Sequence, residues 1–95
     1  ITLFGNFLSY SSEDFDRVIR VNMGGAFFLT QAAAKKMISL NAGGKIILMS
    51  SVTGHQAHKD LAAYSMSKAG IEMLAKNLVI ELASHRICVN AIAPG

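Results

Sequence analysis

The chain has 95 residues, 52% of them hydrophobic, with eight glycines and a formal net charge of +3. Globular chains carry about 45–50% apolar residues with glycine counted, so we expect residues 1–95 to be a single partial domain from the interior of a larger fold. The nine Lys and Arg form no basic patch, and the longest uncharged run, residues 21–34, is too short for a bilayer span. These features exclude a nucleic-acid surface and a membrane helix, and the single cysteine favours a reducing, cytoplasmic location.

The first half of the chain is dominated by one long predicted helix. Residues 1–10 show no hydrophobic period and are predicted to form a loop. Over residues 11–40, apolar side chains recur at three- and four-residue steps, and Glu13 and Asp14 place acids in the first turn. Residues 41–44 contain Asn and two glycines, which are typical of a helix end followed by a turn.

The second half alternates strands with a second helix. Residues 45–50 are nearly continuously apolar, which predicts a short strand buried on both faces. A polar loop over residues 52–60 precedes a helix expected at about residues 61–84. Residues 86–93 are rich in β-branched side chains and predict another strand, which residues 94–95 (Pro-Gly) end.

The order helix, strand, helix, strand predicts an α/β fold class: part of a doubly wound, Rossmann-type parallel sheet. The connecting helices are long enough for right-handed parallel crossovers. Ligands of such sheets bind beyond the carboxyl ends of the strands, which here are residues 50–51 and 94–95.

Some single residues carry expectations about packing. Gly24 and Gly25 each disfavour a helix by about 1 kcal/mol relative to alanine, so close packing on a neighbouring element is expected there. Cys88 is expected to be a small core residue. Glu72 and Lys76, four residues apart, are expected to pair on a wet part of the second helix.

Tyr64 and Lys68 are spaced to share one face of the second helix. A fixed ammonium near a phenol stabilises the phenolate, which makes the hydroxyl a usable proton donor and acceptor. The spacing alone also fits an ordinary surface pair. Its context favours chemistry, because Ser51 lies at a strand end and Asn22 lies on the apolar stripe of the first helix. A buried amide must find partners there or cost about 1–3 kcal/mol, and a helix-bend residue held by backbone or water would also fit.

Four stretches together resemble the short-chain dehydrogenase/reductase family. In chain order they are VNMGGAF at residues 21–27, GKIILMSS at 44–51, YSMSKAG at 64–70 and RICVNAIAPG at 86–95. They cover nearly the whole chain in the order and spacing of the family. The resemblance is therefore much more specific than the spacing of Tyr64 and Lys68.

The resemblance implies a catalytic role for four residues. Tyr64 would be the general acid/base that protonates a carbonyl oxygen or deprotonates an alcohol. Lys68 would favour the ionised form of Tyr64 and hold the nicotinamide ribose. Ser51 would hydrogen-bond the substrate oxygen, and Asn22 would hold a water that links Lys68 to solvent.

The resemblance also implies NAD or NADP as cofactor. The nicotinamide would lie among five residues, namely Met49, Tyr64, Lys68, Pro94 and Gly95. The family's glycine-rich pyrophosphate loop and the residue that selects NAD or NADP should lie upstream of this sequence. The chain is thus expected to lack the N-terminal nucleotide-binding half, and the choice of cofactor stays open.

The implied substrate is a small alcohol or carbonyl compound. In the family the loop after Ser51 borders the substrate cleft, so His55 and His58 are candidate contacts. Without a third ligand, these histidines do not predict a metal site. The family pairs its corresponding long helices between subunits, which implies a homodimer or homotetramer here.

Several functions remain open at this point. The sequence of residues 64–95 looks most like those of sugar dehydrogenases of the glucose 1-dehydrogenase kind, with 3-oxoacyl carrier-protein reductases as the alternative. A non-catalytic binding or assembly domain of the same fold, or an inert truncated fragment, represents another class. The intact Asn22, Ser51, Tyr64 and Lys68 favour the enzyme.

Overall fold

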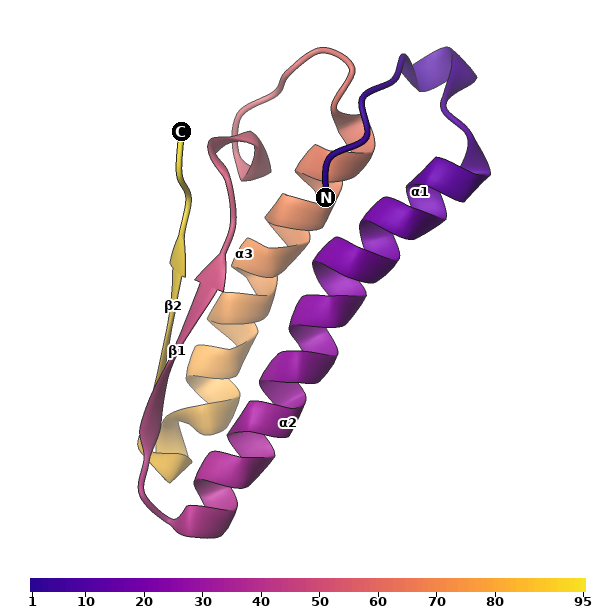
Figure 1. Ribbon diagram of the computed structural model, residues 1–95. Helices are drawn as coiled ribbons and strands as arrows, with labels where there is room; N and C mark the ends of the chain where they lie inside the picture. Colours follow the sequence, from indigo (N-terminus) through magenta and orange to yellow (C-terminus); the bar gives the residue numbers. More distant parts are fainter.

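The computed structural model describes residues 1–95 and contains two parallel strands and three helices. The helices are α1 (Ser12–Ile19), α2 (Gly25–Leu40) and α3 (Ala62–Leu82), and the strands are β1 (Gly44–Met49) and β2 (Ile87–Ile92). Short 3-10 turns lie at Phe7–Ser9, Val52–Gly54 and Ala83–His85. Figure 1 shows the strands on one side, α3 packed beside them, and α1 and α2 as an outer rod. The predicted α/β class and its order of elements are confirmed.

Helices α1 and α2 form one continuous rod, close to the helix predicted over residues 11–40. The Ser11 side chain caps its start by accepting a hydrogen bond from the Asp14 amide at 3.1 Å. A π-helical turn over Arg20–Gly24 joins the two helices, and the hydrophobic period does not predict it. Within this turn lies Asn22, so the polar residue on the apolar stripe coincides with a local widening of the helix.

Two tight turns set the register of the parallel strands. The chain leaves α2 through Asn41 (φ 49) and Gly43 (φ 70), both left-handed, and enters β2 through Arg86 (φ 59). The Gly44 amide donates to the Arg86 carbonyl at 3.2 Å, which ties the two turns together. The predicted helix end at residues 41–44 is confirmed.

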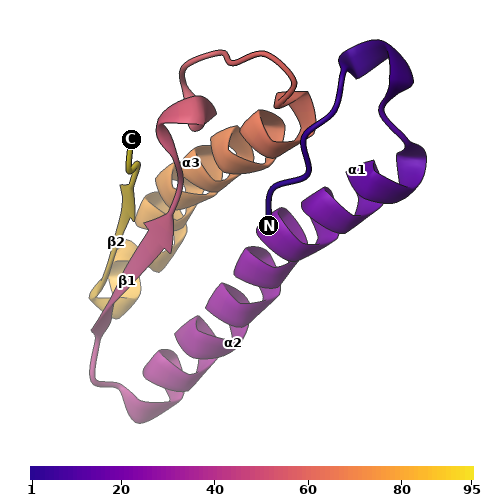
Figure 2. The same cartoon turned by 45° about the horizontal axis from the view of Figure 1, so that its top comes forward.

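Both long helices pack on the same face of the sheet (Figures 1 and 2). The expectation that the first strand is buried on both faces is wrong in this chain, because no element covers the other face; Ile47 is 60% and Met49 52% exposed. Cys88 lies on this open face and is exposed rather than part of the core. The buried apolar core consists of side chains from α2, α3 and both strands: Ala34, Ile46, Leu48, Ile71, Ala75, Ile87 and Val89.

The expected close packing at Gly24 and Gly25 is also wrong within this chain. A Cβ on Gly24 would have no heavy atom within 4 Å, and one on Gly25 would only reach the Arg20 carbonyl at 4.0 Å. Both backbones are right-handed helical, so nothing in their conformation requires glycine.

Among the helices of the structure, none combines the length and the apolar character that a membrane span needs.

Candidate active site

The ends of both strands and the first turns of α3 lie at one end of the molecule (Figure 1). Pairing continues past the strands, because the Ser50 amide donates to the Ile92 carbonyl at 2.7 Å and the Val52 amide to the Pro94 carbonyl at 2.9 Å. The two segments expected to face a ligand are therefore neighbours, and Pro94 and Gly95 are exposed there.

Helix α3 carries Tyr64 and Lys68 one turn apart. The Lys68 ammonium lies over the Tyr64 ring, 5.7 Å from its centroid, within the range of a cation–π contact. Lys68 Nζ also donates to the Met49 carbonyl at 3.1 Å. This bond fixes the ammonium at the end of β1 and leaves two of its three N–H donors for other groups.

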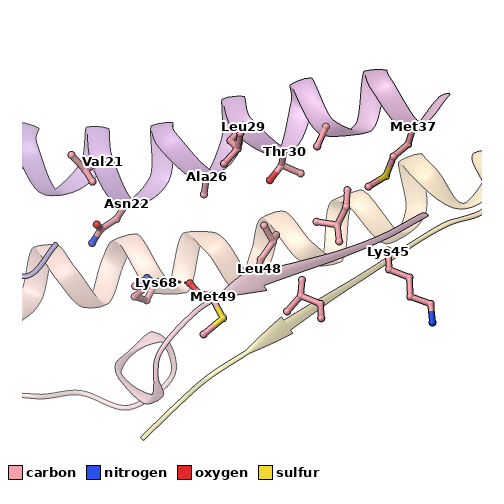
Figure 3. A pocket seen from close by; sticks show the side chains of 13 residues that line it. Val21, Asn22, Ala26, Leu29, Thr30, Met37, Lys45, Leu48, Met49 and Lys68 are labelled. Atoms are coloured by element: carbon pink, nitrogen blue, oxygen red, sulfur yellow. Dashed lines mark hydrogen bonds between the residues drawn. The ribbon is translucent and has the colours of Figure 1, made fainter. Parts of the chain in front are cut away.

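A cavity of about 470 Å³ opens between α2 and β1 (Figure 3). Asn22, Met49 and Lys68 lie near one another in it, with Asn22 reaching in from the π turn and Lys68 from α3. The rest of the lining is mostly apolar, with Val21, Ala26, Leu29, Ala33, Met37, Ile46, Ile47 and Leu48. Tyr64 and Ser51 lie outside this lining, so the cavity gathers only part of the predicted site.

Asn22 is buried, and its side chain joins three segments of the chain. Its Oδ1 accepts from the Ile1 amino group at 2.6 Å, and its Nδ2 donates to the Ile1 carbonyl at 2.8 Å and to Ser67 Oγ at 3.0 Å. Both amide hydrogens are therefore used. A water at Asn22, as the family resemblance implies, would need the remaining lone pair of Oδ1 or the backbone of the π turn.

Ser67 connects Asn22 to the Tyr64 backbone, and sequence reasoning missed it. It has no exposed surface, and its hydroxyl donates to the Tyr64 carbonyl at 2.6 Å while accepting from Asn22. The only signal in the sequence is a small polar residue three positions after Tyr64, which is common on any helix. Its importance comes from α1–α2 and α3 meeting at this point.

Ser51 is buried two residues after the end of β1. Its Oγ accepts from the Thr53 amide and from Thr53 Oγ1, each at 3.3 Å. Because Ser51 is the acceptor in both contacts, its own hydroxyl proton remains available for a ligand oxygen. His58, the other loop candidate besides His55, is exposed.

Glu72 does not form the expected pair with Lys76. Its Oε1 accepts from Ser50 Oγ at 2.8 Å and contacts His55 Nδ1 at 3.2 Å. The hydrogen bond from Ser50, followed by that from His55, lowers the pKa of the Glu72 carboxyl against an opposing desolvation, and Lys76 adds only its charge. A lowered pKa stabilises the folded state at neutral pH, and this contribution is lost as the pH falls through the lowered pKa.

Two parallel strands joined by a helical crossover, with polar residues at their ends, define a Rossmann-type α/β protein. The chain belongs to the short chain dehydrogenase family, whose model matches residues 1–95.

Two curated relatives and one solved structure show the extent of the similarity. The chain is 41% identical over 88 residues to 2-dehydro-3-deoxy-D-gluconate 5-dehydrogenase of Escherichia coli (strain K12), covering 93% of the chain and 35% of the relative. It is 42% identical over 88 residues to (3R)-3-hydroxyacyl-CoA dehydrogenase of Rattus norvegicus, covering 93% and 34%. A crystal structure of a gluconate 5-dehydrogenase from Burkholderia cenocepacia J2315 in complex with NADP and tartrate has a TM-score of 0.96 and 33% identity, covering 100% of the chain and 37% of that structure. The chain thus spans about a third of the length of these proteins.

Proposed function

We propose that the protein containing this chain is an NAD(P)-dependent oxidoreductase that interconverts an alcohol and a carbonyl compound. The Lys68 ammonium carries this proposal, because it lies 5.7 Å from the Tyr64 ring centroid and is bonded to the carbonyl at the end of β1. The relatives support the reaction class, since their names are those of dehydrogenases.

Each of four residues has a task in this reaction. The Tyr64 hydroxyl donates its proton to the carbonyl oxygen during reduction and takes a proton from the alcohol in the reverse direction. The positive charge of Lys68 stabilises the phenolate that remains. Ser51 donates its free hydroxyl proton to the same substrate oxygen. Asn22 holds the Tyr64 backbone through Ser67 and places the π turn where a water could return a proton to Lys68.

The residues around the end of β1 suit a nicotinamide cofactor. The two free donors of Lys68 match the hydroxyls of a ribose, and Met49, Pro94 and Gly95 leave exposed surface beside them. When bound, the cofactor supplies or accepts the hydride. The proposal covers NAD and NADP alike; the Burkholderia structure holds NADP.

For the substrate we favour a sugar or sugar acid. The E. coli and Burkholderia proteins are named for sugar acids. In this chain, His55 Nδ1 lies 3.2 Å from the Glu72 carboxylate, which leaves Nε2 on the exposed side chain for a hydrogen bond with a substrate hydroxyl. His58 lies on the same loop. A 3-oxoacyl carrier-protein reductase is the second candidate, supported by the rat hydroxyacyl-CoA relative.

We further propose that the complete protein is a cytoplasmic homodimer or homotetramer joined through α2 and α3. Support comes from exposed apolar side chains on α2, where Phe27 is 46% and Phe28 65% exposed. A cavity of about 340 Å³ between α2 and α3 is lined in part by Phe27, Leu74 and Leu78.

Tyr64→Phe in the full-length protein tests the reaction. We expect kcat to fall by about 10²–10⁴, the usual contribution of a general acid/base, while the variant still binds the cofactor in a fluorescence titration. Tyr10→Phe is the matched control, because Tyr10 donates only to the Leu3 carbonyl. Near-wild-type turnover of Tyr64→Phe would remove the catalytic assignment. A wild-type protein that turns over neither sugar acids nor 3-oxoacyl thioesters would favour the non-catalytic class.

A further inference from the structure

Ser50, His55 and Glu72 form a cluster, and the proposed reaction gives Ser50 and Glu72 no role. Ser50 is 5% exposed and lies immediately before Ser51, at the end of β1. His55 closes the Val52–Gly54 turn, and Glu72 lies on α3 one turn beyond Lys68. The cluster therefore joins three segments: the strand end, the turn that follows it and the catalytic helix.

The Glu72 carboxylate is the fixed point of this cluster. The Ser50 hydroxyl has one proton and three acceptors near it: Glu72 Oε1 at 2.8 Å, the Lys68 carbonyl at 3.1 Å and the Ser51 carbonyl at 3.4 Å. The carboxylate is both nearest and charged, so it takes the proton most strongly. The same oxygen meets His55 Nδ1 at 3.2 Å.

Gly54 shows how closely the turn approaches this carboxylate. A Cβ at position 54 would lie 2.7 Å from Glu72 Oε1 and 2.7 Å from Ser50 Oγ. Both atoms are ends of side chains that can rotate away, so a methyl group here would break the contact between them without changing a charge. The space for the cluster thus depends on the missing side chain of Gly54.

The end of β1 is tied to α3 at two successive points. Lys68 holds the Met49 carbonyl, and one helical turn further on Glu72 holds the Ser50 hydroxyl. Ser51 is the next residue along the chain, and its orientation follows from these two bonds and from the Thr53 contacts.

We propose that Glu72 is a positioning residue: through Ser50 and His55 its carboxylate holds the strand end and the following turn against α3, and so sets Ser51 relative to Tyr64. The catalytic consequence rests on the proposed function. The holding of the turn does not, because it follows from the contacts alone.

The test compares Glu72→Ala, Glu72→Gln and Gly54→Ala in the full-length protein, with Glu81→Gln as a control on the exposed part of the same helix. We expect Glu72→Ala to lower kcat about tenfold and to raise amide hydrogen exchange at residues 53–55 by a similar factor, with the cofactor KM within about twofold. Gly54→Ala should change kcat and amide exchange in the same way as Glu72→Ala, although it keeps the Glu72 carboxylate. Glu72→Gln retains an oxygen that can accept from Ser50, so it should recover most of kcat.

The two readouts separate the possible failures. If amide exchange at residues 53–55 is unchanged in both Glu72→Ala and Gly54→Ala, Glu72 does not hold the turn against α3. If Glu72→Ala and Gly54→Ala raise exchange but keep the wild-type kcat, Glu72 does not position Ser51. The same conclusion follows if Glu81→Gln loses as much kcat as Glu72→Ala. If the wild-type protein has no turnover, the proposed function fails, and the exchange measurement alone decides whether Glu72 holds the turn. A thermal unfolding curve of each variant separates local loosening from global unfolding, and Glu72→Gln, the mildest change, covers the case in which Glu72→Ala does not fold.

Discussion

One buried hydroxyl, that of Ser67, stabilises the contact between the π turn and α3. Its replacement in Ser67→Ala leaves one Asn22 amide hydrogen and the Tyr64 carbonyl without their present partner. A buried donor that loses its acceptor costs about 1–3 kcal/mol, so we expect Ser67→Ala to lower the free energy of unfolding of the full-length protein by that amount, measured by urea denaturation.

Ser65 provides the matched control on the same helix. Its Oγ is buried and has no hydrogen-bond partner, so Ser65→Ala removes a hydroxyl that makes no bond. We expect this variant to be neutral or slightly more stable, because it removes a buried polar group without a partner. Equal losses in the two serine variants would show that the bond to Asn22 contributes little.

Among the secondary-structure elements, the turn between α2 and β1 determines how the strands meet. Gly43 has φ +70, and a Cβ there would lie 2.8 Å from the Arg86 carbonyl oxygen. This oxygen accepts the hydrogen bond from the Gly44 amide. Left-handed backbone costs a residue with a side chain about 1–2 kcal/mol, and the clash adds to it. We expect Gly43→Ala to lower the free energy of unfolding by at least about 2 kcal/mol, measured by urea denaturation.

Gly24→Ala is expected to change stability in the opposite direction. Gly24 lies in right-handed helical backbone with open space around its Cα, so alanine should stabilise the rod by about 0.5–1 kcal/mol. A loss at position 24 would show that another part of the full-length protein packs against this glycine, as the sequence suggested.

The sequence predicts the elements well and their surroundings poorly. Hydrophobic period, acids near Ser11 and the glycines after Asn41 are local signals, and the helices and strands that they predict are confirmed. The partners of Glu72 lie 17 and 22 residues away, and the link from Asn22 to Ser67 spans 45, so only the folded arrangement reveals them. A continuous apolar strand likewise does not show which of its faces is covered within a given length of chain.

The molecule as a whole is elongated and leaves much apolar surface open. Its radius of gyration is 14.8 Å, with extents of 48 × 24 × 17 Å, whereas about 12 Å is usual for a compact chain of this length. Only 15 of the 95 residues are buried. The open face of the sheet and the outer side of α2 account for part of the apolar excess in the composition, because their side chains have no cover within residues 1–95.

This open surface determines how the 95-residue chain should behave alone. We expect a broad thermal transition by circular dichroism and binding of the dye ANS, because helices and strands form but most apolar side chains lack partners. Ile71 tests this reading, since it is 2% exposed at the centre of the small core. In a well-packed domain Ile71→Ala costs about 2–5 kcal/mol, whereas a loosely packed chain should show almost the same broad transition with either residue. A sharp transition that Ile71→Ala shifts strongly downward would instead show that seven buried side chains suffice for a cooperative fold.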